Sequence, residues 1–357
     1  MPPQSATVPS KARPTRALIV DDSPVMQRLI AATLGKDPRI EVVAMASNAS
    51  EARELIKQTE PDVLTLDVEM PGMSGLEFLR RLQKLRPMPV IMVSTLTGRG
   101  TATAMEAMAL GAIDCVCKPT GKPSDPGFSG LADKVVAAAG SRRSLQMHAA
   151  MTGTPPAAAA PAASFKPSDR VLLIGASTGG VPALTALLAR FPENCPPTLI
   201  VQHMPQGFTR SFATRLDAHC APEVREAAHG DVVKVGRVLI APGGGRHLTI
   251  VGRRHFTCAL TEGEPVSGHR PSVDVLLDSA LPIADRTLGL IMTGMGEDGA
   301  AGLAALRKAG ARTMVQDEAS SAVYGMPRAA FEMGAAERVL PLDRIAPAIL
   351  EVCAHAG

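Results

Sequence analysis

Two long blocks of the chain alternate short apolar runs with amphipathic segments, and this alternation constrains the fold more than any other feature. The first block, residues 16–138, has apolar runs such as RALIVDD and DVLTLD, separated by segments with helical spacing such as GLEFLRRLQKL. This alternation is typical of βαβ units, whose parallel strands form a sheet with helices on both faces. The pattern restarts at residue 170 with RVLLIGAS. We therefore expect an α/β fold of two doubly wound domains.

A stretch rich in alanine and proline separates the two blocks. Residues 153–169 read GTPPAAAAPAASFKPSD, and proline disfavours both helices and sheets. A chain of 357 residues is also long for one compact core. We expect four parts, namely a disordered tail, a first domain, a linker and a second, mostly parallel α/β domain. Their predicted bounds are residues 1–15, 16–138, 139–168 and 169–357.

The composition argues against several classes of protein. Hydrophobic residues make up 46% of the chain and charged residues 20%, and the net charge of +3 is small for a nucleic-acid-binding protein of this length. No apolar run approaches the roughly 18 residues of a membrane span, and the N-terminal segment has no signal-peptide pattern. The six cysteines are scattered without a C-x-x-C pair. We therefore expect a cytoplasmic protein that neither binds nucleic acid nor inserts into a membrane.

Acidic, hydroxyl and basic side chains end the apolar runs of the first block. Asp21 and Asp22 end the first run, Asp67 the third, Ser94 the fourth and Lys118 the fifth. The carboxyl ends of parallel strands share one edge of a sheet, so these side chains are expected to meet there. Three carboxylates in one place need a cation, and a set of oxygen ligands suits Mg²⁺. Separate solvated strand ends would explain any one of these residues but not all of them together.

Four motifs of the first block carry a resemblance to a known family. VDDSP, LDVEMPGMSGLEFL, MVST and CKP resemble the motifs of a response-regulator receiver domain, which has a flavodoxin-like fold with five parallel strands. The resemblance extends over the whole first block. It implies that Asp67 accepts a phosphoryl group, that Ser94 is the switch hydroxyl and that Lys118 binds the phosphoryl group.

The receiver resemblance also implies a metal site and shows one departure from the family pattern. Asp21, Asp22 and Asp67, together with the backbone carbonyl of Glu69, would hold the Mg²⁺ that phosphorylation requires. Receivers often carry an aromatic residue three positions before the lysine, and the rotamer of that residue reports phosphorylation. This chain has Cys115 at that position, so we do not expect an aromatic switch.

A glycine-rich turn opens the second block. Residues 175–179, GASTG, have the G-x-S-x-G form of a nucleophilic serine, although such a turn can also cradle a phosphate. A serine nucleophile needs a histidine base, and the base needs a carboxylate. His203 ends the apolar run TLIVQH and Asp298 follows LGLIMTG, so both are expected near Ser177 at one edge of the sheet. His247, after APGGGR, is a further histidine that could lie near the site.

An alternative interpretation uses the segment that contains Asp298. Residues 294–299, GMGEDG, match the G-x-G-x-x-G dinucleotide fingerprint after a strand-like run, and Asp317 and Glu318 follow about 20 residues later. The motif stands late in its block, however, away from the first βα turn where a dinucleotide-binding fold keeps it. The order Ser…His…Asp differs from that of α/β-hydrolases, so the serine motif does not indicate that family either.

Further motifs of the second block resemble the catalytic domain of the chemotaxis methylesterase (CheB) family. They cover nearly the whole block in unchanged order: IGASTGGVPAL, VQHMPQGFTRSFATRLD, APGGGRHL, HRPSVDVLLDS, TGMGEDGAAGL and QDEASSAVYGMPRAA. The resemblance implies that Ser177 is the nucleophile, His203 the general base and Asp298 the residue that orients the base. We further expect the backbone N–H groups of Thr178 and Met295 to hold the oxyanion.

Together the two resemblances imply a phosphorylation-activated serine esterase of chemotaxis adaptation. It would demethylate glutamate methyl esters on chemoreceptors, release methanol and deamidate certain receptor glutamines, with no cofactor for the esterase reaction. A chemotaxis histidine kinase would be the phosphodonor, and the unphosphorylated receiver would cover the catalytic cleft. The alternatives are a receiver-controlled dinucleotide-binding protein and a non-catalytic interaction protein. A DNA-binding regulator is disfavoured, because no basic stripe follows the linker.

Overall fold

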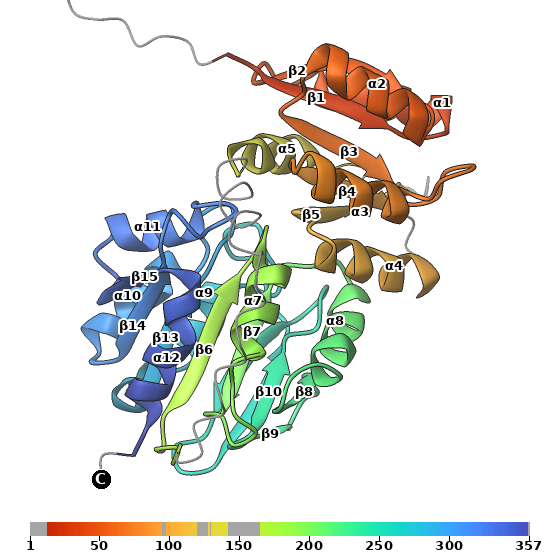
Figure 1. Cartoon of the computed structure of the whole chain (residues 1–357). Helices are drawn as coiled ribbons and strands as arrows, with labels where there is room; N and C mark the ends of the chain where they lie inside the picture. Colours follow the sequence, from red (N-terminus) through yellow and green to blue (C-terminus); the bar gives the residue numbers. More distant parts are fainter. Residues whose placement is uncertain (1–12, 95–97, 120–127, 129, 142–164, 356–357) are drawn as a thin grey trace, which may run out of the picture.

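The computed structural model describes residues 13–94, 98–119, 128, 130–141 and 165–355 of the chain. Most of the predicted tail and most of the predicted linker, residues 1–12 and 142–164, lie outside the described residues. The first strand begins at Thr15, and the last helix of the first domain ends at Gly140. Two α/β units are present, and each is built around its own sheet (Figure 1). The predicted fold class is therefore confirmed.

A five-stranded parallel sheet forms the first domain. Its elements are β1 (Thr15–Val20), α1 (Pro24–Leu34), β2 (Ile40–Ala46), α2 (Ala49–Thr59), β3 (Val63–Asp67), α3 (Gly75–Leu85), β4 (Val90–Ser94), α4 (Gly98–Ala109), β5 (Asp114–Cys117) and α5 (Leu131–Gly140). The strand order is β2-β1-β3-β4-β5. Helices α2, α3 and α4 bury their apolar faces on one side of the sheet, and α1 and α5 bury theirs on the other.

The strands that carry the predicted receiver residues are covered on both faces. Every residue of β3 and β4 is buried, which explains why VLTLD and VIMVS read as nearly continuous apolar runs. Helix α1 starts immediately after the first strand end. The side chain of Ser23 accepts a hydrogen bond from the N–H of Met26 as the N-cap, and Pro24 fits the first helical turn. This sharp start keeps Asp21 and Asp22 at the edge of the sheet.

A larger parallel sheet forms the second domain, with the strand order β15-β14-β13-β6-β7-β10-β8. A small antiparallel sheet, β11-β12-β9, packs beside it. The elements are β6 (Val171–Ala176), α7 (Gly180–Leu188), β7 (Thr198–Gln202), α8 (Phe208–Asp217), β8 (Glu223–Glu226), β9 (Val232–Val233), β10 (Arg237–Ile240), β11 (His247–Val251), β12 (Phe256–Thr261), α9 (Val273–Asp278), η1 (Leu281–Arg286), β13 (Thr287–Ile291), α10 (Ala300–Lys308), β14 (Arg312–Gln316), α11 (Met326–Glu332), β15 (Arg338–Leu340) and α12 (Leu342–Cys353).

Strand β6 lies at the centre of this larger sheet. Strands β7, β10 and β8 build outward on one side of it, and β13, β14 and β15 build outward on the other. Helices α7, α8 and α12 cover one face, while α9, α10, α11 and the small sheet cover the other. The carboxyl end of β6 is therefore a topological switch point, the place where open α/β sheets usually bind their ligands.

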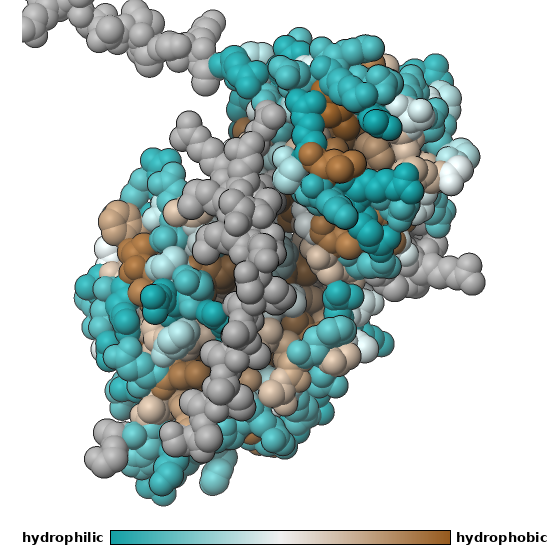
Figure 2. Space-filling view, viewed as in Figure 1, coloured by the Kyte–Doolittle hydropathy of each residue, from teal (hydrophilic) through white to brown (hydrophobic). Residues whose placement is uncertain are grey.

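The outer surface of both domains is mostly hydrophilic on the face that Figure 2 shows, with hydrophobic residues in small, separate patches. Exposed large hydrophobic side chains occur on several elements, among them Val25 on α1, Leu85 on α3 and Phe331 on α11. Isolated exposed hydrophobic residues are ordinary on protein surfaces and need no special explanation. Within the described ranges, none of the helices has the length and apolar character needed to cross a bilayer.

Candidate active site

Three predicted residues of the second domain follow neighbouring strands of its parallel sheet. Ser177 directly follows β6, His203 directly follows β7, and Asp298 lies in the turn between β13 and α10. Since β6 lies between β7 and β13, the strand ends bring these three residues to one edge. The backbone N–H of His203 donates a hydrogen bond of 3.0 Å to the carbonyl oxygen of Ala176, which ties the two strand ends together. Ser177 is half-buried there.

His203 and Asp298 form a close, buried pair. The distance from His203 Nε2 to Asp298 Oδ2 is 2.8 Å, and the side chains are 8% and 0% exposed. Burial alone would raise the pKa of the Asp298 carboxyl group. The hydrogen bond and positive charge of His203, together with backbone N–H donors, instead lower this pKa to about 2. Asp298 is therefore a carboxylate at neutral pH, able to orient the imidazole ring and to stabilise its protonated form.

The start of helix α9 holds the Asp298 carboxylate from the other side. Ser272 Oγ donates a hydrogen bond of 2.7 Å to Oδ1, and the backbone N–H of Asp274 donates one of 3.0 Å to the same oxygen. The backbone N–H of Val273 donates one of 2.7 Å to Oδ2. A helix N-terminus offers unpaired N–H groups that favour a negative charge. Together with His203, these groups engage both oxygens of Asp298.

The second ring nitrogen of His203 is available for chemistry. Nδ1 is buried and has no hydrogen-bond partner among the residues that the structure describes. Because Nε2 faces the carboxylate, Nδ1 is the atom that can accept a proton from a hydroxyl group.

The position of the serine turn is fixed by Gln202. Gln202 Nε2 donates a hydrogen bond of 2.9 Å to the carbonyl oxygen of Ser177 and so holds the serine turn at the end of β7. A serine, a base and a carboxylate therefore gather at one sheet edge.

Backbone N–H groups beside Ser177 are also available. In the described part of the chain, neither the N–H of Thr178 nor that of Met295 donates a hydrogen bond to another residue. Gly294 lets the Met295 segment approach, because a Cβ atom on Gly294 would lie 2.8 Å from the Cβ atom of Ser177. Free N–H groups in such a turn can stabilise a negative oxygen that develops near the serine.

His269 is a site residue that the sequence interpretation did not single out. Its ring stacks on that of His203, with the ring centroids 3.7 Å apart and the planes at 10°. Burial, and then the charge of His203, lower the pKa of His269 to about 4, so this ring is neutral near pH 7. His269 and Ser272 both lie in the motif HRPSVDVLLDS. That motif was the available signal, although its irregular segment gives no strand or helix pattern that would place them.

The first domain brings its predicted residues together at the carboxyl edge of the five-stranded sheet. Carboxylate oxygens of Asp21, Asp22 and Asp67 all lie within 4.8 Å of one another, so these residues could hold a metal ion. Lys118 Nζ lies 2.9 Å from Asp21 Oδ2 and 2.8 Å from Asp67 Oδ2. Ser94, the last residue of β4, is buried. An all-oxygen set of this kind suits a hard divalent cation.

Burial and charge pull against each other in this acidic cluster. Burial raises the pKa of the Asp67 carboxyl group. The hydrogen bond and positive charge of Lys118 lower this pKa, but burial is the larger effect. Burial also acts to lower the pKa of Lys118, but the hydrogen bonds and negative charges of Asp67 and Asp21 outweigh it, so that pKa is raised. Lys118 therefore remains a cation directly beside Asp67, where it can neutralise a further negative group.

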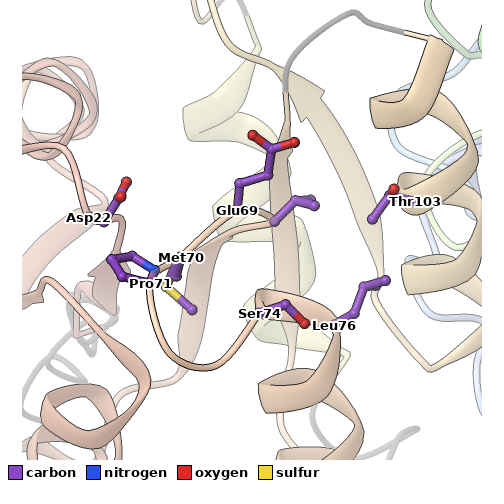
Figure 3. A pocket seen from close by; sticks show the side chains of 8 residues that line it. Asp22, Glu69, Met70, Pro71, Ser74, Leu76 and Thr103 are labelled. Atoms are coloured by element: carbon purple, nitrogen blue, oxygen red, sulfur yellow. The ribbon is translucent and has the colours of Figure 1, made fainter.

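A cavity of about 590 Å³ opens beside the acidic cluster (Figure 3). Its lining comes from the turn after β1, the loop after β3, the start of α3 and from α4. Asp22 and Glu69 are the carboxylates among the lining residues that Figure 3 labels. The residues are Asp22, Val68, Glu69, Met70, Pro71, Ser74, Leu76 and Thr103. The cavity therefore borders the acidic cluster at Asp22 and at Val68, the residue that follows Asp67.

Comparison with known proteins assigns both halves of the chain. Residues 17–124 match the family model of the response regulator receiver domain, and residues 172–349 match that of the CheB methylesterase. A protein of Agrobacterium fabrum, named protein-glutamate methylesterase/protein-glutamine glutaminase, is 54% identical over 343 residues, which cover 94% of this chain and 96% of the relative. The chain belongs to the CheB methylesterase family.

A second full-length relative and a solved catalytic domain also match this chain. A Rhizobium etli protein of the same name is 52% identical over 342 residues, covering 96% of this chain and 97% of the relative. The solved structure of the CheB methylesterase catalytic domain of Thermotoga maritima is 37% identical, with a TM-score of 0.50. The match covers 52% of this chain and 99% of the Thermotoga maritima domain. These matches favour a methylesterase over the dinucleotide-binding and non-catalytic alternatives.

The segment of residues 294–299, which matches the dinucleotide-binding motif, has a different role in the structure. Its Asp298 is fully buried and engaged by His203 and the start of α9. Its first glycine, Gly294, makes room for the serine turn. The spacing that matched a dinucleotide motif thus occurs in a segment that packs against Ser177.

Cys115 occupies the receiver position where the family resemblance led us to look for an aromatic residue. The residue lies in β5 and is buried. Burial raises the pKa of its thiol well above the usual range, so the side chain is a neutral, small apolar group. The absence of an aromatic switch at this position remains a prediction.

The two domains touch at the serine turn, a contact that the sequence did not predict in detail. The side chain of Thr178 donates a hydrogen bond of 2.7 Å from Oγ1 to Oδ2 of Asp114, the first residue of β5. The backbone N–H of Gly179 donates one of 3.1 Å to the carbonyl oxygen of Ile113. Lys134 on α5 pairs with the same Asp114 oxygen at 2.8 Å. The receiver therefore contacts the residue that follows Ser177.

Proposed function

We propose that this chain is a phosphorylation-activated methylesterase that hydrolyses glutamate methyl esters on chemoreceptors and deamidates certain receptor glutamines. The observation that carries the proposal is the buried His203–Asp298 pair at the same sheet edge as Ser177. The free Nδ1 of His203, in the part of the chain described, is the base that such a reaction needs. The relatives that match over nearly the whole chain are named for this activity.

Acylation begins at the hydroxyl group of Ser177. Its Oγ forms a bond to the ester carbonyl carbon while its proton passes to Nδ1 of His203, and Asp298 stabilises the resulting imidazolium. The backbone N–H groups of Thr178 and Met295 hold the oxyanion of the tetrahedral intermediate. When the intermediate collapses, the bond to the methoxy group breaks, and methanol leaves with the proton from His203.

Deacylation repeats these steps with water as the nucleophile. His203 takes a proton from water, whose oxygen attacks the acyl carbon of the glutamyl-enzyme. The bond to Ser177 then breaks, the serine regains its proton, and a glutamate side chain is released. A receptor glutamine follows the same route, except that ammonia leaves in place of methanol. The esterase site holds all the groups that these steps require, so we assign it no cofactor.

Control of this reaction is assigned to the receiver. Asp67 would accept a phosphoryl group from a chemotaxis histidine kinase, and Lys118 and Ser94 would bind the phosphoryl oxygens. Asp21, Asp22 and Asp67, with the carbonyl of Glu69, would hold Mg²⁺, which neutralises charge on the phosphoryl group. The unphosphorylated receiver would restrict access to Ser177 through its contact with the serine turn, and phosphorylation would weaken that contact.

The cell compartment and domain bounds complete the proposal. We assign the receiver to residues 16–138, the linker to 139–168 and the catalytic domain to 169–357.

The cysteines bear on the cell compartment. None of the six cysteines forms a disulfide bond in the structure, and all six lie within its described residues. Free thiols suit a reducing compartment, and we place the protein in the cytoplasm, where the kinase and the cytoplasmic part of a receptor would be available.

Methanol release from methylated receptor membranes tests the proposed activity. We expect the wild-type protein to release methanol and Ser177→Ala to lose this activity by at least about a thousandfold, because the variant lacks the hydroxyl group that is assigned as the nucleophile. Addition of kinase and ATP should increase the wild-type rate but not that of Asp67→Asn. Full methanol release by Ser177→Ala would overturn the assigned nucleophile. Equal rates for the phosphorylated wild type and Asp67→Asn would overturn the proposed control.

A further inference from the structure

Ser272 is a buried residue whose hydroxyl group contacts Asp298 at the carboxylate oxygen that does not face His203. It is 0% exposed, and its Oγ donates the hydrogen bond of 2.7 Å to Asp298 Oδ1. The same Oγ accepts a hydrogen bond of 3.4 Å from the N–H of Val275 as the N-cap of α9. A hydroxyl group has one proton to donate, and here that proton is directed at a carboxylate.

His247 supports Ser272 from the neighbouring antiparallel sheet. The backbone N–H of Ser272 donates a hydrogen bond of 3.2 Å to Nδ1 of His247, so the ring proton must be on Nε2. That Nε2 group donates one of 3.0 Å to the carbonyl oxygen of Glu264. Both ring nitrogens of His247 are thus engaged, and the side chain is 2% exposed. This arrangement fixes the backbone of Ser272 relative to β11.

Each oxygen of Asp298 therefore has two donors with different roles. Oδ2 faces His203 Nε2 and the N–H of Val273, while Oδ1 faces the hydroxyl group of Ser272 and the N–H of Asp274. The donors on Oδ1 prevent the carboxylate from turning about its Cβ–Cγ bond, so that Oδ2 stays directed at His203. They also spread the negative charge of a buried group that must stabilise an imidazolium.

We propose that Ser272 is a positioning residue of the esterase site, held in place by His247. It acts on the reaction through Asp298 and His203 and makes no contact with the substrate. The inference rests on the proposed function, since the reaction it serves is the one assigned to Ser177. Loss of the hydroxyl group should lower kcat and leave KM unchanged, because it disturbs the base and not the binding of the ester.

Ser272→Ala and Ser279→Ala form a matched pair of variants at the N-cap and the C-cap of α9. The hydroxyl group of Ser279 donates to the carbonyl oxygen of Leu276 at 2.7 Å and accepts from the N–H of Ile250 at 3.0 Å, away from Asp298. We expect kcat for methanol release to fall about tenfold in Ser272→Ala, with KM unchanged, and to change little in Ser279→Ala. Ser272→Thr, which keeps a hydroxyl group, should retain a kcat near that of the wild type.

A second measurement does not depend on the esterase assay. The proton on His203 Nε2 lies in the hydrogen bond to Asp298 and should give a downfield proton NMR resonance. We expect this resonance to move or broaden in Ser272→Ala and to remain in place in Ser279→Ala. If Ser272→Ala does not fold, Ser272→Gly removes the same hydroxyl group at an N-cap position that tolerates glycine.

The outcomes separate this inference from the proposed function. If the wild type releases no methanol, the proposed function fails, and the NMR comparison still decides the role of Ser272. If the wild type is active and Ser272→Ala keeps its kcat and its His203 resonance, the positioning role is overturned while the proposed function stands. Equal losses of kcat in Ser272→Ala and Ser279→Ala would also overturn it, because they would indicate a general effect on α9.

Discussion

The stacked rings of His203 and His269 make the site sensitive to acid. The two centroids are only 3.7 Å apart, and Lys134 adds a positive charge, whereas the charge of Asp298 favours a protonated His269. Burial is the largest effect, and together these groups lower the pKa of His269 to about 4. An imidazole in an unfolded chain has a pKa of about 6.5. Between these values the unfolded chain binds a proton that the folded protein does not.

The free energy of unfolding should therefore fall as the pH is lowered from about 6.5 toward 4. His269→Phe keeps an aromatic ring against His203 but cannot take up a proton. We expect this variant to lose less stability than the wild type between pH 7 and pH 4.5, measured by urea unfolding at both pH values. His255→Phe, a change at an exposed histidine, is the control and should follow the wild type. Parallel losses in the wild type and His269→Phe would contradict the prediction.

Residues of the site differ in how far the sequence could place them. Ser177 and His203 directly follow buried strands, and Asp298 lies in the turn after a third one, so the general behaviour of parallel sheets was enough to bring them together. His269 and Ser272 lie in an irregular segment before α9, and their partners are distant in the chain. No periodicity reports such contacts. The family motif contains both residues, but a motif does not show which atoms they contact.

The turn between β13 and α10 packs closely against the serine. Gly294 accepts two hydrogen bonds at its carbonyl oxygen, from the N–H groups of Gly325 and Met326, which start α11. A Cβ atom at Gly294 would meet the side chain of Met326 and the Cβ atom of Ser177. The short distance between the turn, α11 and the serine leaves no room for a methyl group.

Gly294→Ala should therefore displace Ser177 or the Met295 segment and lower kcat by about tenfold or more, because small shifts of a nucleophile or of oxyanion donors are costly. The fold should persist, since only one turn has to move. Methanol release and circular dichroism would measure the two effects. Gly140→Ala, where a Cβ atom meets nothing within 4 Å, is a matched control and should keep full activity. Unchanged kcat in Gly294→Ala would show that the packing is looser than these distances indicate.

At the level of elements, long buried strands were easier to predict than short ones. β3, β4, β6 and β13 are buried throughout and read as apolar runs in the sequence. β8 and β15 are edge strands of four and three residues with polar or exposed positions, so their sequences show no clear pattern. Their assignment depends on pairing with β10 and β14, which only the folded sheet supplies.

At the scale of the whole molecule, the contact between the domains lies next to the proposed nucleophile. Asp114 of the receiver accepts the hydroxyl hydrogen bond of Thr178 and pairs with Lys134 in its own domain. Helix α4 also packs against α7 and α8 of the catalytic domain. The family resemblance implied that the receiver covers the catalytic cleft, but it could not show which residues meet, because neither domain's pattern contains information about the other's surface.

Asp114→Ala removes the receiver's side-chain acceptor at this contact. A hydrogen bond to a carboxylate contributes more than a neutral one, so its loss should shift the protein toward the undocked state and raise the unphosphorylated methanol-release rate by about threefold to tenfold. The phosphorylated rate should not change, because the contact is already weakened there. Asp133→Ala is the control, since Asp133 pairs with Arg39 within the receiver. An unchanged unphosphorylated rate, or an equal rise in both states, would place the control of the esterase elsewhere on the receiver surface.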